Sequence, residues 1–232
     1  MNRKIFRYIF SLAFLLLPLL LEAQEADTVQ APRSVSIGFD LTGPALNALG
    51  NSGLRLEGHL GYRLNYKYYL VCEPGFADYS YEQYNYSYKS SGWFARLGTD
   101  IGMLAPVASK INHFAGIGLR YGLSVFEQES PFISIDNYWG EINTSIPAHP
   151  VHAHFLEVQG SVKTEVFRNF QIGWAIKLRT LIYTSGKNDK KPVYIPGYGL
   201  NDAGIAPAIS YYIIYRFPFR SSSGESSASP GK

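Results

Sequence analysis

The sequence is poor in cysteine and in charged residues. Its 232 residues include a single cysteine, Cys72, and only 17% of them are charged. One cysteine excludes an internal disulfide framework and any cysteine-rich metal site. The net charge of +3 forms no basic stripe, so we expect no nucleic-acid partner. The apolar neighbours of Cys72 favour a buried or lipid-facing structural thiol over a reactive one.

Long apolar runs are also scarce, and the clearest lies at the N-terminus. Residues 9–21 form an apolar run between a basic start and the small residue Ala23. This order is typical of a secretory signal peptide, which we place at 1–23, followed by a periplasmic lead-in at 24–34. A transmembrane anchor is the alternative, but the run is shorter than the roughly 20 residues that a spanning helix needs, and Pro18 interrupts it. A lipid anchor would need a cysteine at the cleavage point, and none is there.

Alternating polarity dominates the rest of the chain. Apolar and polar side chains follow one another with a period of two, which in a strand sends neighbours to opposite faces. The predicted strands cover residues 34–41, 54–63, 68–77, 93–103, 116–124, 156–165, 172–179 and 205–219. The connections near residues 65, 107 and 169 are short, whereas those at 79–91, 126–152 and 185–202 are long. We predict no helix of useful length after the signal.

The pattern predicts an all-β fold, an antiparallel up-and-down transmembrane β-barrel of about eight strands at 35–219. A soluble barrel would enclose the apolar face, but that face carries about thirty mostly bulky residues, too many for such a lumen. We therefore expect a Gram-negative outer membrane location, with lipid around the barrel, the N-terminus and short turns in the periplasm, and the long loops outside. The Ser/Gly-rich tail at 220–232 is predicted to be disordered. The expected aromatic girdle comprises Tyr62, Tyr66, Tyr68, Tyr69 and Trp93.

The polar face carries charges of both signs, and buried charges need partners. Inside a narrow barrel they are expected to form a paired network that fills the lumen. The network residues are Asp40, Arg55, Glu57, Arg63, Glu73, Arg96, Asp100, Arg120, Glu157, Lys163, Glu165, Lys177, Arg179 and Arg216. The alternative function for such a lining is a narrow channel for ions or small solutes.

Several stretches carry a resemblance to a known group of proteins. They are residues 92–100, 156–158, 162–170, 194–199 and 211–217. Over most of the mature chain the sequence resembles a family of uncharacterised small outer-membrane β-barrel proteins of the Bacteroidetes. The resemblance implies a barrel in the outer membrane and no established activity. The closing aromatic strand also looks like the signal that the barrel-assembly machinery recognises, although here a polar tail follows it.

Three histidines form the most suggestive local cluster. His152 and His154 would share one face of a strand, close to His149, a spacing compatible with metal binding. The alternative is solvated histidines near the rim of the barrel. Since no carboxylate or cysteine stands at a matching spacing, we predict no metal and no cofactor.

Enzyme activity is the remaining alternative. A hydrolase or acyltransferase at the rim could use His154 with Asp136, Ser134 or Ser130, but no known catalytic motif is present. The Tyr-rich segment at 79–88 is either a recognition surface or a rim that extends the third and fourth strands. We therefore predict a monomeric, non-enzymatic protein with a structural or surface-interaction role.

Overall fold

The computed structural model describes residues 33–50, 53–65, 67–104, 113–138, 140–185, 191–202 and 204–219. The predicted signal peptide, most of the lead-in, the turn near residue 107 and the polar tail lie outside these ranges. The long strands are β1 (Ser34–Asp40), β2 (Leu54–Arg63), β3 (Tyr68–Gln83), β4 (Tyr86–Gly102), β5 (His113–Asn137), β6 (Gly140–Phe167), β7 (Phe170–Thr184) and β10 (Ile205–Pro218).

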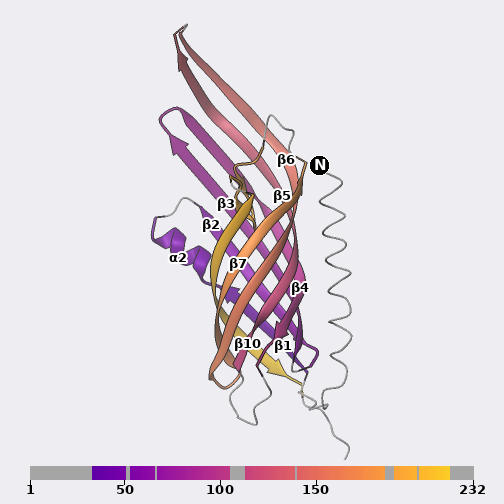
Figure 1. Ribbon diagram of the computed structural model, residues 1–232. Helices are drawn as coiled ribbons and strands as arrows, with labels where there is room; N and C mark the ends of the chain where they lie inside the picture. Colours follow the sequence, from indigo (N-terminus) through magenta and orange to yellow (C-terminus); the bar gives the residue numbers. More distant parts are fainter. Residues whose placement is uncertain are drawn as a thin grey trace, which may run out of the picture. The chain divides into compact units, whose positions relative to one another are not determined.

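These eight strands form a closed antiparallel barrel (Figure 1). Each strand pairs with the next along the chain, and β1 closes the ring by pairing with β10, with Ile37 opposite Tyr215. The prediction of an eight-stranded up-and-down barrel is confirmed. Pro74 leaves a local gap in the β2–β3 ladder, because paired residues flank it at Gly75 and Cys72 but Pro74 itself has no partner on β2.

The two faces of the barrel wall follow the period-two pattern. Trp93 and Ile209 point outward and are 70% and 67% exposed, whereas inward-pointing Arg96 and Ser210 are fully buried. Apolar side chains therefore cover the outside, whereas the inside holds polar and charged side chains together with buried apolar ones such as Phe94 and Phe155. Cys72 lies on the outer face and is half-buried. Of the predicted girdle, Tyr69 is an exception, since it lines a cavity inside the barrel; Tyr66 is outside the described residues.

Two of the predicted long loops are in fact strands. The β3–β4 ladder continues through the Tyr-rich segment to the pair Gln83–Tyr86, and the β5–β6 ladder continues to Asn137–Gly140. Outside the barrel wall both faces of a hairpin can be polar, so apolar alternation fades while backbone pairing persists. The β5–β6 hairpin projects well past the other strands at this end (Figure 1). We call residues 129–148 the arm.

A short helix was not predicted. α2 (Thr42–Ala48) follows β1 and packs against β2 and β10. β1 ends at Asp40, one residue earlier than expected, and the Asp40 carboxylate accepts a hydrogen bond from the Thr42 backbone N–H at 2.8 Å. Seven residues are too few for a helical period to stand out in the sequence. No helix in the described part of the chain is long and apolar enough to cross a membrane.

The two described short turns, β2–β3 and β6–β7, lie at the same end of the barrel as the start of β1 and the end of β10. At the β2–β3 turn the Asn65 side chain accepts hydrogen bonds from the backbone N–H groups of Lys67 and Tyr68. At the β6–β7 turn Asn169 adopts a φ of 66°, a conformation that asparagine tolerates better than most residues. Both positions are confirmed as tight turns.

Candidate functional site

Arg96 stands at the centre of the lumen and contacts three carboxylates. Its guanidinium pairs with Glu57, with Glu73 at 3.1 Å and with Glu157 at 3.0 Å. All four side chains are at most 1% exposed. Glu73 is the cross-strand partner of Arg96 on the neighbouring strand β3, whereas the contacts with Glu57 on β2 and Glu157 on β6 join strands that are not neighbours in the sheet. Buried charges in this geometry need such partners because desolvation is costly.

Two further cationic side chains, Lys177 and Arg179, belong to this network. The Lys177 ammonium lies 2.8 Å from Glu57 and 3.6 Å from Glu73, and Arg179 Nε lies 2.7 Å from Glu157. The Tyr212 hydroxyl, also buried, lies 3.2 Å from Glu57 and 3.3 Å from Glu73. Tyr212 is not among the predicted lumen residues, because its aromatic ring does not mark it as one.

The network continues towards the end with the short turns. Arg120 pairs with Asp100 at 2.8 Å and with Glu73 at 3.5 Å, and Lys163 lies 3.2 Å from Asp100. His59 Nδ1 lies 3.3 Å from a Glu73 oxygen. His59 points inward and is 1% exposed, but it is not among the predicted network residues because histidine does not carry a fixed charge.

The structure therefore connects most of the predicted lumen residues, but not all. One continuous network holds Glu57, Glu73, Arg96, Asp100, Arg120, Glu157, Lys163, Lys177 and Arg179. Arg55 with Asp40 and Arg216 with Glu165 form separate pairs at 3.7 and 3.1 Å. Arg63 has no ion pair within the described residues and donates instead to the Asn65 backbone carbonyl at 3.2 Å.

The described part of the predicted loop at 185–202 lies inside the barrel, next to the network. Its described part contains the two-residue strands β8 (Tyr194–Ile195) and β9 (Gly199–Leu200). We call residues 191–202 the plug. Arg96 donates to the Gly197 carbonyl at 3.5 Å and Arg179 donates to the Tyr198 carbonyl at 3.0 Å. The plug therefore caps the network with its own backbone carbonyls.

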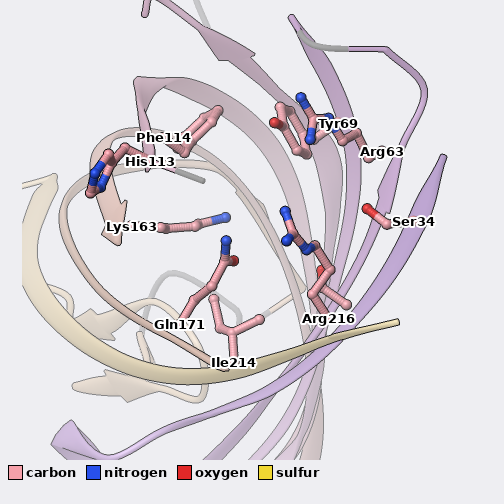
Figure 2. A pocket seen from close by; sticks show the side chains of 10 residues that line it. Ser34, Arg63, Tyr69, His113, Phe114, Lys163, Gln171, Ile214 and Arg216 are labelled. Carbon is pink, nitrogen blue, oxygen red and sulfur yellow. The ribbon is translucent and has the colours of Figure 1, made fainter. Parts of the chain in front are cut away.

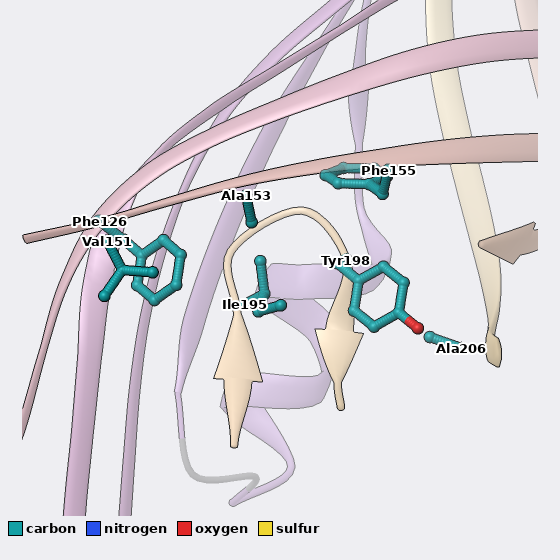
Figure 3. Close-up of a cluster of buried hydrophobic side chains, with 7 residues drawn as sticks. All are labelled: Phe126, Val151, Ala153, Phe155, Ile195, Tyr198 and Ala206. Atoms are coloured by element: carbon teal, nitrogen blue, oxygen red, sulfur yellow. The ribbon is translucent and has the colours of Figure 1, made fainter. Parts of the chain in front are cut away.

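The plug also packs against the inner wall. Ile195 and Tyr198 are buried in an apolar cluster with the wall residues Phe155 and Phe126 (Figure 3). Gly197 has a φ of +77°, and a Cβ there would lie 2.5 Å from the Phe94 ring. Only glycine fits this backbone conformation and this close approach without strain.

Tyrosines secure the outer side of the plug. The Tyr88 hydroxyl lies 3.2 Å from the Tyr194 carbonyl and 3.3 Å from its backbone N–H, and the rings of Tyr194 and Tyr79 stack at 4.4 Å. Burial raises the pKa of both Tyr88 and Tyr194, so these phenols stay protonated at neutral pH. Part of the Tyr-rich segment thus contacts the plug instead of solvent. The Tyr84 side chain, at the hairpin tip, is fully exposed.

The histidines and the hydroxyls of the hypothetical hydrolase lie apart. His154 on β6 hydrogen-bonds the Tyr121 hydroxyl at 2.6 Å, whereas Ser130 pairs with Ile146, eight residues along β6 from His154. Ser134 donates to Glu141 at 2.8 Å. His149 contacts Gln128 and the Pro147 carbonyl. Across the described ranges, no group of three His, Cys, Asp or Glu side chains is placed to hold a metal ion.

These observations define a class of protein: an eight-stranded antiparallel barrel with an apolar exterior, an ion-paired interior and a plugged mouth. Residues 5–222 match the sequence family described as "Domain of unknown function (DUF6048)", and the chain belongs to that family. No curated protein is significantly similar to it in sequence.

Several solved barrel structures are similar to this chain. CarO2 of Acinetobacter baumannii is 12% identical, with a TM-score of 0.35 over 81% of this chain and 99% of that chain. Neisserial surface protein A is 13% identical, with a TM-score of 0.36 over 81% and 94%. Ail, the attachment invasion locus protein of Yersinia pestis, is 10% identical, with a TM-score of 0.35 over 82% and 100%.

Proposed function

We propose that this protein is a monomeric, non-conducting outer-membrane barrel that holds a rigid interaction surface, the arm, outside the membrane. The observation that carries the proposal is the continuous ion-pair network centred on Arg96, capped by the plug. A lumen filled in this way serves as a structural core and leaves no path for solutes. We therefore assign the surface role to the segments that extend beyond the barrel wall.

The outer face supports a membrane location. Exposed apolar side chains encircle the wall, a surface that a soluble monomer rarely presents. The belt includes Ile37, Leu60, Leu70, Trp93, Leu97, Ile117, Leu119, Val158, Val162, Trp174, Ile176, Leu178, Ile209 and Phe217.

The belt has a defined upper edge. Asp78 pairs with Ser91, and Ser91 pairs with Glu127, so these three residues form a polar row across β3, β4 and β5. Below that row the outward positions of β4 run from Trp93 to Ile101 without a charge. About nine residues of tilted strand match the thickness of a bilayer core. Trp93, next to the polar row, lies where an interfacial aromatic belongs.

The arm is the best candidate for the interaction surface. It presents Phe132, Ile135, Ile142 and Tyr138, all exposed, and Tyr138 is 94% exposed. Within the described residues, β7 pairs with β6 only from Ala153 onward, so the β6 edge of the arm has free backbone groups. Such an edge can bind an extended segment by strand addition.

Planar-bilayer recording tests the closed lumen. We expect the purified protein to give no steady conductance steps. Ion-selective conductance steps in the wild type, with a different ion selectivity in the K163Q variant, would overturn the proposal and favour the narrow channel. The location has its own test: a mature protein that remains soluble and folded without detergent would contradict insertion into the membrane.

The surface role needs a separate measurement. Cells that carry the protein with residues 130–147 deleted should keep the same amount of barrel in the outer membrane but lose the protein's contribution to surface adhesion or envelope integrity. If the deletion leaves every such property of a complemented strain unchanged, the arm is not the functional surface.

A further inference from the structure

The cavity that Tyr69 lines lies inside the barrel, at the end with the short turns. It holds about 50 Å³ and is separate from the plug, which closes the opposite end. Ser34, Arg63, Tyr69, Lys163, Gln171 and Arg216 are among the side chains that line it (Figure 2). This volume accommodates a few water molecules, or one carboxylate or phosphate group, but not a sugar ring.

The charged side chains that line this cavity are all basic. Arg63, Lys163 and Arg216 line it, whereas the described lining contains no Asp or Glu. Arg216 forms an ion pair with Glu165. Lys163 forms one with Asp100, which also pairs with Arg120. Arg63 has no carboxylate partner in the described ranges. The cavity is therefore an electropositive concavity with low-dielectric walls, which concentrates anions.

Gln171 provides a second and independent observation. Its side chain is only 8% exposed, yet its carboxamide makes no hydrogen bond to any described residue. Its amide nitrogen and oxygen are not fully buried but open to the cavity, where a water molecule or a ligand can pair with them. Figure 2 shows the Gln171 amide, the Lys163 ammonium and the Arg216 guanidinium converging on the same space.

Aromatic rings hold two of the cations in place. The Arg63 guanidinium lies 5.5 Å from the centre of the Tyr69 ring, and the Lys163 ammonium lies 5.1 Å from that of Phe114. The two rings pack edge to face at 5.0 Å. Cation–π contacts of this kind fix side chains that would otherwise sample many rotamers. The donors are thus preorganised before any ligand arrives.

We propose that this cavity is a binding site for a single oxyanion group, a carboxylate or a phosphate, with Arg63, Lys163, Gln171 and Arg216 as its donors. Arginine guanidinium groups match the paired oxygens of both groups. The site faces the compartment that holds the short turns, which is the periplasm in the proposed orientation. The anion itself would be a small molecule or the end of a larger one.

Thermal unfolding of the detergent-purified protein tests the site. Sodium phosphate and sodium acetate are titrated separately, each against sodium chloride of equal ionic strength, because a ligand that binds the folded state raises Tm. We expect at least one of the two anions to raise Tm in a saturable manner. A response to phosphate alone, to acetate alone or to both identifies the source of the oxyanion. A response no larger than that of chloride overturns the proposal.

Matched variants locate the binding. R63Q should raise the half-saturating concentration about tenfold, because a charge-assisted donor is lost. R168Q removes the same charge from an exposed turn at the same end and should leave the titration unchanged. Q171L changes no charge and should also weaken binding several-fold. The assignment would be contradicted if the half-saturating concentration rose equally in R63Q and R168Q, or if the titration were unchanged in Q171L. None of these measurements involves conductance, so the proposed anion site and the proposed closed lumen are tested independently of each other.

Discussion

Arg96 on β4 and Glu157 on β6 meet at 3.0 Å, although β5 separates their strands in the sheet. Their contact therefore crosses the lumen and ties together walls that backbone hydrogen bonds do not connect directly. The same Glu157 oxygen also accepts from Arg179 at 2.7 Å. One carboxylate thus balances two buried guanidinium groups.

Removal of the Glu157 charge should destabilise the barrel strongly. E157Q keeps the shape of the side chain but leaves Arg96 and Arg179 without their shared anion, and breaking a buried ion pair costs about 3–5 kcal/mol. Urea unfolding in detergent or vesicles measures the loss. E127Q, on the polar row outside the belt, is the control and should change the free energy of unfolding by less than about 0.5 kcal/mol. Equal stability of the two variants would show that the network does not support the fold.

The outer face allows a test that depends on lipid. L97R places a charge in the middle of the apolar belt and should cost about 2–4 kcal/mol in a bilayer. S91R points to the same side of β4 but at the polar row, where the cost is about 0–1 kcal/mol. Folding efficiency into lipid vesicles, followed by heat-modifiable gel migration, separates the two. If L97R and S91R fold into vesicles with equal efficiency, the apolar belt does not lie in the hydrocarbon core of the bilayer.

The sequence predicted the wall of the barrel well, and for a physical reason. Each wall strand separates lipid-facing from lumen-facing positions, so the period of two shows both the strands and the charges that meet inside. Arg96 and Glu157 were selected in this way without knowledge of their distance. The pairing itself was not predictable, since it depends on which strands face one another across the closed ring.

The plug and the arm lacked this signal. In the plug, Ile195 and Tyr198 are buried by closure of the whole barrel, and a short stretch between Pro and Gly residues has no period that indicates burial. Just before the arm, the polar row at Glu127 interrupts the apolar alternation, while the backbone ladder continues into the arm. Tyr212 was missed because an aromatic side chain on a membrane strand is expected to point to lipid.

The tip of the plug should be sensitive to a single methyl group. G197A adds a Cβ at a φ of +77° and 2.5 Å from the Phe94 ring, so we expect a loss of about 1–3 kcal/mol. Limited proteolysis should then cut within residues 191–202 faster than in the wild type. G160A is the control, because a Cβ there meets no atom within 4 Å. Equal protease resistance of G197A and the wild type would show that the plug is not held at this point.

The arm should be dispensable for the barrel itself. Among the described residues, its strands pair with one another and with the end of β4, where the register shifts between Tyr86 and Lys89, and Ser134 also donates to the Asn85 carbonyl in the β3–β4 turn. Deletion of residues 130–147 should therefore preserve heat-modifiable migration and the urea midpoint within error. A shorter wall provides the contrast: deletion of residues 153–156 with their partners 121–124 removes Phe155 from the plug cluster and should abolish folding. If the arm deletion also abolishes folding, the arm is part of the structural core and its proposed role as a separate interaction surface is wrong.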